Sequence, residues 1–451
     1  MHLCWNPAVR HVGAMNETRR PQPSFRHLIS AFWRVGLLSF GGPAGQIALM
    51  HREIVEDRGW IEEEDYLQAL NVCHLLPGPE AQQLATWIGW RLHGLRGGLA
   101  AGLLFVIPGA VIMAALSILY ALAANLDWFA ALFLGVKAAV LAIVLQALLR
   151  IGGKALDTPL RQGLALTAFL ALFALDLPFP LVVLGALALG AAVAAVRPGA
   201  LGLKPITAAP ITGPRPWRTT VLTVLAWGAI WAAPLVLVLV TLGREHVLWD
   251  IGLFFSQLAI VTFGGAYAVL AYMAQQAVET YGWLGPGEMA DGLGLAETTP
   301  GPLIMVTQFV GFLGAWRAPE PFTPLVAGLL GAGLTTWVTF APCFLWIFAL
   351  APWMDRLAHA PRLRGGLAAV TAAVVGVIAN LALWFALHVL FTRVGETRIG
   401  PLALTAPDWT SLDGRAAVLT VLALAMTFML KWGVVRVLAV CAAGGLLLSL
   451  A

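Results

Sequence analysis

Long apolar runs dominate the chain and are separated by short stretches that carry most of its charged residues. Several runs reach about 18 residues or more, the length at which an α-helix crosses roughly 30 Å of hydrocarbon. Hydrocarbon offers backbone N–H and C=O groups no hydrogen-bond partner, so segments that cross it must be helical. The pattern predicts an all-α membrane protein with about 12–13 membrane segments, over residues 27–50, 66–90, 97–123, 127–150, 162–175, 178–196, 217–242, 249–274, 287–316, 322–350, 366–392, 414–430 and 433–450.

Composition agrees with this pattern. Of the 451 residues, 60% are hydrophobic and only 11% are charged, whereas a soluble domain carries roughly 25% charged residues. The four cysteines are scattered without metal-binding spacing, so we expect no disulfide, no metal and no other cofactor. The sequence contains no Walker A loop, Rossmann fingerprint, HExxH or GxSxG motif. We therefore expect neither an enzyme nor a nucleic-acid-binding protein, but a transporter that runs on ion gradients or membrane potential.

The distribution of charge predicts the orientation in the membrane. Residues 1–24 hold arginines but no apolar core, so they do not resemble a secretory signal peptide and are predicted to form a cytoplasmic tail. With the N-terminus inside, most basic loops fall on the cytoplasmic side and the acidic run 53–65 falls outside. We expect a multi-pass protein of the bacterial inner membrane; the sequence leaves open whether it works as a homodimer.

The chain contains an internal repeat. Ser39-Phe-Gly-Gly recurs as Thr262-Phe-Gly-Gly, an offset of 262 − 39 = 223 residues, and the same offset relates Pro77-Gly-Pro to Pro300-Gly-Pro. Because one extra apolar segment separates the halves, the second repeat is expected to be inverted in the membrane, as in many secondary transporters. The predicted organisation is a tail (1–24), a first repeat (25–196), a Pro/Gly-rich linker (197–216), a connecting helix (217–242) and a second repeat (249–451).

These repeated motifs should break the helices that contain them. Proline removes an amide donor and paired glycines weaken a helix, so each break leaves a half-helix whose first N–H groups are free. Such an N-terminus attracts anions. The alternative is a proline kink used only for packing. Together with two glutamine amides as further donors, the predicted anion-binding residues are Gly41, Gly42, Pro77, Gly78, Pro79, Gln82, Gln83, Gly264, Gly265, Pro300, Gly301 and Pro302.

Two cations lie inside predicted membrane segments of the first half. Arg34 and Lys137 have the uncharged repeat mates Gln257 and Thr371. Intramembrane charges are costly and usually functional, so we expect both cations to be unpaired and available to a doubly charged anion. The alternatives are that they reach the membrane interface or pair with a nearby carboxylate.

Three titratable residues flank the Pro-Gly-Pro motifs. Glu80 follows the first motif, Glu297 precedes the second, and His74 is the repeat mate of Glu297 (297 − 223 = 74). The helix dipole disfavours a negative charge at Glu297, near the end of its helix, so a proton should be held readily there. We predict that Glu80, His74 and Glu297 couple proton movement to transport; the alternative is a hydrogen-bonded structural network.

At these motifs the sequence resembles the chromate ion transporter family, in its long-chain, two-domain form. The resemblance covers roughly residues 27–392 and implies proton-coupled export of chromate from the cytoplasm, with resistance to chromate. Sulfate or another tetrahedral oxyanion is the alternative cargo, and an intramembrane enzyme or scaffold is the remote alternative. The motifs that carry the resemblance are Arg34-Val-Gly-Leu-Leu-Ser-Phe-Gly-Gly-Pro, Leu75-Leu-Pro-Gly-Pro-Glu-Ala-Gln-Gln-Leu and Ala296-Glu-Thr-Thr-Pro-Gly-Pro-Leu.

Overall fold

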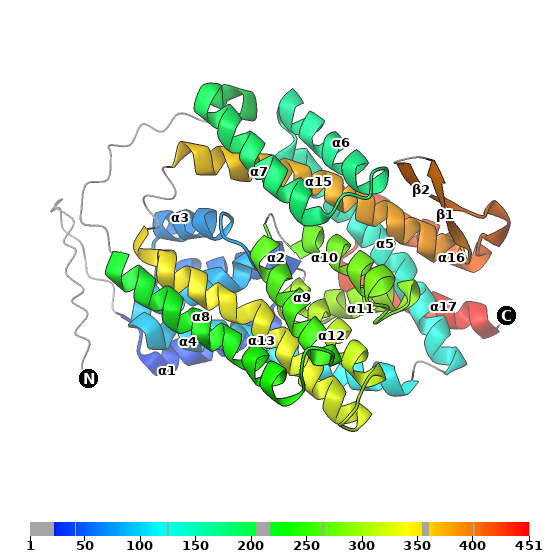
Figure 1. Cartoon of the computed structure of the whole chain (residues 1–451), viewed down its shortest axis with the longest axis horizontal. Coiled ribbons are helices and arrows are strands. Elements are labelled where there is room, and N and C mark those ends of the chain that lie inside the picture. Colours follow the sequence, from blue (N-terminus) through cyan, green and yellow to red (C-terminus); the bar gives the residue numbers. More distant parts are fainter. Residues whose placement is uncertain are drawn as a thin grey trace.

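The computed structural model describes residues 22–40, 42–123, 126–203, 217–263, 266–353, 360–399 and 402–450. Nearly all of these residues are helical, and the helices lie mostly along the long axis of the molecule (Figure 1). The first half comprises α1 (Phe25–Leu38), α2 (Gly42–His51), η1 (Arg52–Glu56), α3 (Glu63–Cys73), α4 (Glu80–Ala123), α5 (Asp127–Ala155), α6 (Pro159–Phe173), α7 (Phe179–Val196) and η2 (Pro198–Leu201).

Helix α8 (Trp217–Thr241) follows, and the second half repeats the same succession with a hairpin added. Its elements are α9 (Val247–Val261), α10 (Ala266–Gln275), η3 (Gln276–Thr280), α11 (Pro286–Thr298), η4 (Leu303–Met305), α12 (Val306–Arg317), α13 (Pro324–Leu350), η5 (Ala351–Trp353), α15 (Pro361–Leu390), β1 (Val394–Ile399), β2 (Leu402–Pro407), η6 (Trp409–Ser411), α16 (Gly414–Leu424), η7 (Ala425–Met429) and α17 (Val434–Leu450).

The helices confirm the prediction of an all-α membrane protein. Shorter apolar helices such as α6 and α9 accompany the long ones, and α8 has one exposed side, as expected of a helix that faces lipid, and one partly buried side that packs on α13. Among the described residues, six helical stretches are long and apolar enough to cross a membrane: Glu80–Ala123, Asp127–Ala155, Phe179–Val196, Trp217–Thr241, Pro324–Trp353 and Pro361–Leu390.

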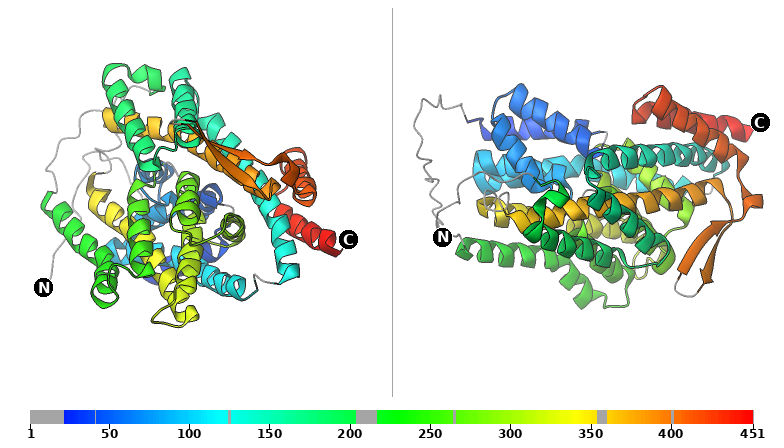
Figure 2. Two further views of the ribbon diagram at one scale, coloured as in Figure 1. Left: turned by 45° about the vertical axis from the view of Figure 1, so that its right-hand side comes forward. Right: turned by 90° about the horizontal axis from the view of Figure 1, so that it is seen from above.

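The two halves exchange their last helices. Helices α6 and α7 of the first half pack on α15 of the second, while α16 and α17 of the second half pack on α5 of the first. Small residues permit the close approach: a side chain added at Gly190 would lie 2.4 Å from the carbonyl oxygen of Gly365. In Figure 2 the layer formed by α6, α7 and α15 can be followed in two further views. This exchange ties the halves into one hydrophobic core.

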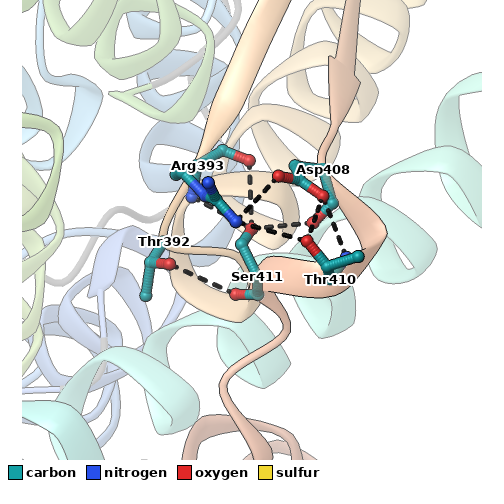
Figure 3. Close-up of polar contacts among 5 residues, drawn as sticks. All are labelled: Thr392, Arg393, Asp408, Thr410 and Ser411. Carbon is teal, nitrogen blue, oxygen red and sulfur yellow. Dashed lines mark hydrogen bonds and ion pairs between the residues drawn. The ribbon is translucent and has the colours of Figure 1, made fainter.

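One element was not foreseen in the sequence. Between α15 and α16 the chain forms an antiparallel hairpin, in which Val394 pairs with Pro407 and Ile399 with Leu402. A polar cluster closes its base (Figure 3). Arg393 forms an ion pair with Asp408 at 3.0 Å, and the Asp408 carboxylate accepts hydrogen bonds from the backbone and side chain of Thr410. These short-range contacts fasten the base of the hairpin to the end of α15.

Replacing Asp408 by asparagine should loosen the hairpin without affecting transport. The Thr410 hydrogen bonds, with a smaller contribution from Arg393, lower the pKa of Asp408 from its ordinary value of 3.8. The stabilisation is therefore present above pH 3.8 and is lost as the pH falls through the lowered value. Amide hydrogen exchange of the hairpin should be faster in Asp408→Asn at neutral pH, and the difference should vanish in strong acid. Equal exchange at neutral pH would show that the cluster does not hold the hairpin.

Candidate functional site

The helices end at the motifs that were predicted to break them. Helix α1 stops at Leu38 and α2 begins at Gly42, which has a φ of 70°. In the second half α9 stops at Val261 and α10 begins at Ala266. The predicted site residues Gly41, Gly264 and Gly265 lie outside the described residues.

The Pro-Gly-Pro motifs separate helices in the same way. The first lies between α3 and α4, and the second between α11 and η4. Their central residues, Gly78 and Gly301, have φ angles of 116° and 102°, a region that residues with a side chain rarely adopt. The flanking prolines exclude a continuous helix. The geometry of both motifs thus follows directly from their sequence.

Each Pro-Gly-Pro motif contacts the broken helix of the other half. The amide of Gly78 donates a hydrogen bond of 2.8 Å to the carbonyl oxygen of Thr262, and the amide of Gly301 donates one of 2.9 Å to that of Ser39. This reciprocal arrangement corrects one expectation. The central amide of each motif is not free for an anion, because it is used to join the two halves.

A second pair of contacts has the same reciprocity. Gly109 of α4 lies against the second motif: a side chain at Gly109 would come within 2.5 Å of the Pro300 carbonyl oxygen. Cys343 of α13 lies against the first motif, because its sulfur would be 2.9 Å from a side chain placed at Gly78. Pro108 and Pro342 precede these two residues in their helices. Each motif is therefore enclosed by two elements of the opposite half.

Buried glutamine amides surround the two motifs. Gln83 donates to the Pro77 carbonyl oxygen at 2.7 Å, and Gln82 donates to Thr86 at 3.2 Å. Gln46, which the sequence analysis did not select, donates to the Gly301 carbonyl oxygen at 2.5 Å. Within the described part of the chain, the side-chain oxygen of each of these glutamines is buried without a hydrogen-bond partner. Such unsatisfied acceptors are costly, and each calls for a hydrogen-bond donor beside it, so this region between the motifs is polar rather than apolar.

The predicted proton-coupling residues occupy different environments. Glu80 begins α4 directly after Pro79, and Glu297 is one residue from the end of α11; their exposed fractions are 9% and 6%. His74 follows α3 and is exposed. The structure thus buries both carboxylates beside the motifs but leaves the histidine at the surface.

Arg34 is not an unpaired cation. Its guanidinium lies 3.2 Å from the Glu53 carboxylate, which is buried and also contacts Arg58. The Arg34 side chain itself is 61% exposed. The expectation of an unpaired charge was wrong because the chain changes direction between α1 and α2, and η1, which continues α2, then places Glu53 beside α1.

Lys137 is paired as well. Its Nζ lies 3.4 Å from Oδ1 of Asp291 on α11, and Tyr120 of α4 donates a 2.7 Å hydrogen bond to Oδ2. Sequence reasoning missed Asp291, although it is an intramembrane carboxylate within the predicted segment 287–316 and the reasoning applied to Lys137 could have found it. The pair lies about 10 Å along α11 from its end at Thr298, so it is separate from the Pro-Gly-Pro motif.

The described residues also enclose a cavity of about 90 Å³ between α6, α10 and α15. Asp176, Glu279 and Asn380 are among its lining residues, and none of the predicted site residues lines it. Glu279 accepts a 3.3 Å hydrogen bond from Trp384, and Asp176 accepts one of 3.0 Å from Gln275. Two carboxylates make this cavity a poor place for a doubly charged anion.

A multi-pass membrane protein with paired, interrupted helices belongs to the class of membrane transport proteins. Comparison with known families makes this specific: the family model described as chromate transporter matches residues 26–194 and 249–447. The chain belongs to the chromate transporter family.

Two relatives illustrate the similarity. The chromate transport protein of Pseudomonas aeruginosa is 32% identical over 397 residues, which cover 86% of this chain and 87% of the relative. The chromate transport protein of Cupriavidus metallidurans is 30% identical over 363 residues, covering 79% and 82%. No solved structure matches the chain. These relatives are transport proteins, which agrees with the prediction that the chain is not an enzyme.

Proposed function

We propose that the chain is a secondary active transporter that exports chromate from the cytoplasm through the region where each of its two Pro-Gly-Pro motifs contacts the broken helix of the other half. The observation that carries the proposal is the reciprocal pair of hydrogen bonds, Gly78 to Thr262 and Gly301 to Ser39. Because each motif is held by the opposite half, any movement of one half against the other must change both motifs together. The names of the relatives support chromate as the cargo.

Anion binding in this region would use the start of α4 and the buried amides. The amides of Glu80 and Ala81 lie in the first turn of α4, where a helix leaves its N–H groups without backbone acceptors. Gln82 and Gln83 donate one amide hydrogen each, to Thr86 and to the Pro77 carbonyl oxygen, and the second hydrogen of each NH₂ group is a donor that an oxyanion could use. We therefore propose that the substrate-binding residues predicted from the sequence act mainly around the first motif.

We also propose that the two halves are inverted repeats. In Figure 1 the last part of α4 runs from left to right, whereas its counterpart α13 runs from right to left. The single extra helix α8 between the halves supports the same view. With a cytoplasmic N-terminus, as the basic loops suggest, the halves would open to opposite sides of the inner membrane.

Membrane potential favours export. Moving one charge across 100 mV is worth about 2.3 kcal/mol, so a dianion gains roughly twice that when it leaves a negative-inside cell. Proton coupling through Glu297, Glu80 and His74 would add to this driving force. Uptake of a dianion would have to overcome the membrane potential by moving cations with it. Export needs no such coupling, so we favour export as the direction of transport.

Bacterial cells that lack a chromate exporter test the proposal. Cells expressing the chain should accumulate less chromate and tolerate higher external concentrations than cells carrying the empty vector. Correct membrane insertion is checked by fractionation and by a fluorescent fusion. Unchanged accumulation and tolerance, with the protein inserted, would contradict chromate export.

A second candidate, export of sulfate or another oxyanion, follows from the chemistry of the site, because backbone amides recognise charge and shape rather than the central atom. Counterflow into vesicles distinguishes the two. Chromate-loaded vesicles should take up labelled chromate faster than vesicles loaded with sulfate, and the reverse order would make sulfate the cargo.

A further inference from the structure

A buried ion pair joins the two halves away from the Pro-Gly-Pro motifs. Lys137 of α5 faces Asp291 of α11 at 3.4 Å, and the exposed fractions of their side chains are 24% and 6%. Tyr120 donates to Oδ2 of Asp291, whereas Oδ1 accepts no hydrogen bond from the described residues. The ammonium therefore has one loosely held partner and remains partly accessible.

This ion pair has no charged counterpart in the repeat. The mate of Lys137 is Thr371, and the mate of Asp291 is Gln68 (291 − 223 = 68). By contrast, the neighbouring pair between Glu288 and Arg317 has an analogue in the first half, where Asp65, the mate of Glu288 (288 − 223 = 65), pairs with Arg91 although Arg91 is not at the repeat position of Arg317. A pair needed only to build the fold would be expected in both halves. The Lys137–Asp291 pair occurs only once in the two repeats, which indicates a role that the repeats do not share.

We propose that Asp291 is a built-in competitor of the transported anion: it holds Lys137 when the transporter is empty and gives it up when the oxyanion binds. This inference rests on the proposed function, because it assumes that an oxyanion passes Lys137. It assigns to Asp291 the role of setting anion affinity and release.

The physical reason lies in the cost of an unpaired charge. A cation that is mostly buried loses stability without a partner, so a negative partner stabilises Lys137 both before and after the anion has passed. A dianion attracts Lys137 more strongly than a single carboxylate does, and it can therefore displace Asp291. When the anion leaves, Asp291 takes its place, so release does not leave a bare ammonium.

The surroundings leave room for this exchange. A side chain at Gly287, in the first turn of α11, would come within 3.0 Å of the Lys137 Nζ, so glycine keeps the space beside the ammonium open. Tyr120 already occupies one oxygen of Asp291, which weakens the hold of the carboxylate on Lys137.

Other charges near Asp291 are already engaged. Glu288 of α11 lies near Asp291, and Arg317 of α12 lies near Tyr120, but Glu288 and Arg317 pair with each other at 2.5 Å. Helices α15 and α17 also pack on α11, yet in the described part of the chain neither contributes an ion pair or hydrogen bond to Asp291. The exchange is thus confined to Lys137, Asp291 and Tyr120.

Equilibrium binding of labelled chromate to the purified, detergent-solubilised full chain tests this inference. Asp291→Asn should bind chromate on the order of tenfold more tightly, because the competitor has lost its charge, and should turn over more slowly in vesicles. Lys137→Met should weaken binding by a similar factor. Tyr120→Phe should weaken binding as well, since Asp291 then holds Lys137 more firmly.

Two further variants make the result decisive. Glu288→Gln removes a carboxylate one turn away and should leave the affinity within about twofold of the parent. The double variant Lys137→Met/Asp291→Asn replaces the pair by neutral groups of similar size, which usually preserves folding, and it should bind as weakly as Lys137→Met alone.

Unchanged affinity in Asp291→Asn, with only a lower melting temperature, would overturn the inference and make the pair structural. Tight binding by the double variant would also overturn it, because Lys137 would then not be an anion ligand. Both results leave the proposed function intact. If the parent protein binds neither chromate nor sulfate, the proposed function fails and this inference fails with it.

Discussion

Replacement of Gly78 or Gly301 by alanine is expected to reduce chromate flux by at least about tenfold. Both glycines have φ angles above 100°, where a side chain costs about 1–3 kcal/mol. At Gly78 the added carbon would also lie 2.9 Å from Cys343 Sγ and from Gln83 Nε2. Relief of this strain would displace the amide that bonds to Thr262, and a lost hydrogen bond adds about 1 kcal/mol.

The measurement is flux of labelled chromate into vesicles, normalised to folded protein that elutes as a single species in detergent. Gly228→Ala is the matched control, because Gly228 lies in α8 with open space around it. That variant should transport like the parent. Full flux in both Gly78→Ala and Gly301→Ala would show that the contacts of the two motifs with the opposite halves are not needed for transport.

The second large effect is expected at Glu297. Its side chain is 6% exposed and lies one residue from the end of α11, where the helix dipole opposes a negative charge. A proton bound there would be released or taken up as the surroundings of α11 change. Glu297→Gln should therefore retain exchange of chromate for chromate but lose the response of net flux to a pH gradient.

Vesicles with a fixed membrane potential and a variable pH gradient provide the test. The same chemical change at an exposed loop, Glu245→Gln, should leave the response unaltered. A pH response in Glu297→Gln that equals that of the parent would remove Glu297 from the coupling scheme and leave Glu80 and His74 as the candidates.

Much of the fold could be predicted because lipid imposes simple rules. Long apolar runs have no alternative to helix in hydrocarbon, and the predicted segment 217–242 corresponds to α8 at Trp217–Thr241. Glycine and proline set the backbone through local sterics alone, so the breaks at Gly42, Gly78 and Gly301 could also be predicted.

The parts that could not be predicted depend on contacts between distant residues. The exchange of α7 and α17 between halves depends on close packing of small residues, which leaves no periodic signal in the sequence. The hairpin at 394–407 is short and shows no regular alternation of apolar and polar residues, and its polar base brings together Arg393 and Asp408 across the two strands. Local patterns therefore predicted loops there.

In the candidate site, too, local sequence predicted some features, whereas contacts between distant residues determined others. Sequence reasoning selected Lys137 and Arg34 as costly intramembrane charges but expected both to be unpaired, because Asp291 and Glu53 approach them only in three dimensions. It also assigned free amides to Gly78 and Gly301, whereas these amides bond across the two halves. Gln46 gave no signal in the sequence, since its role depends on where Gly301 lies.

The most direct test of outward chromate transport uses the purified chain alone in vesicles with an imposed potential. The orientation of the protein is fixed by a tag that is accessible from one side only. With the cytoplasmic face of the protein outward and the vesicle interior positive, labelled chromate should accumulate inside, and reversal of the potential should abolish accumulation. Absence of flux, or flux that does not depend on the sign of the potential, would contradict the account.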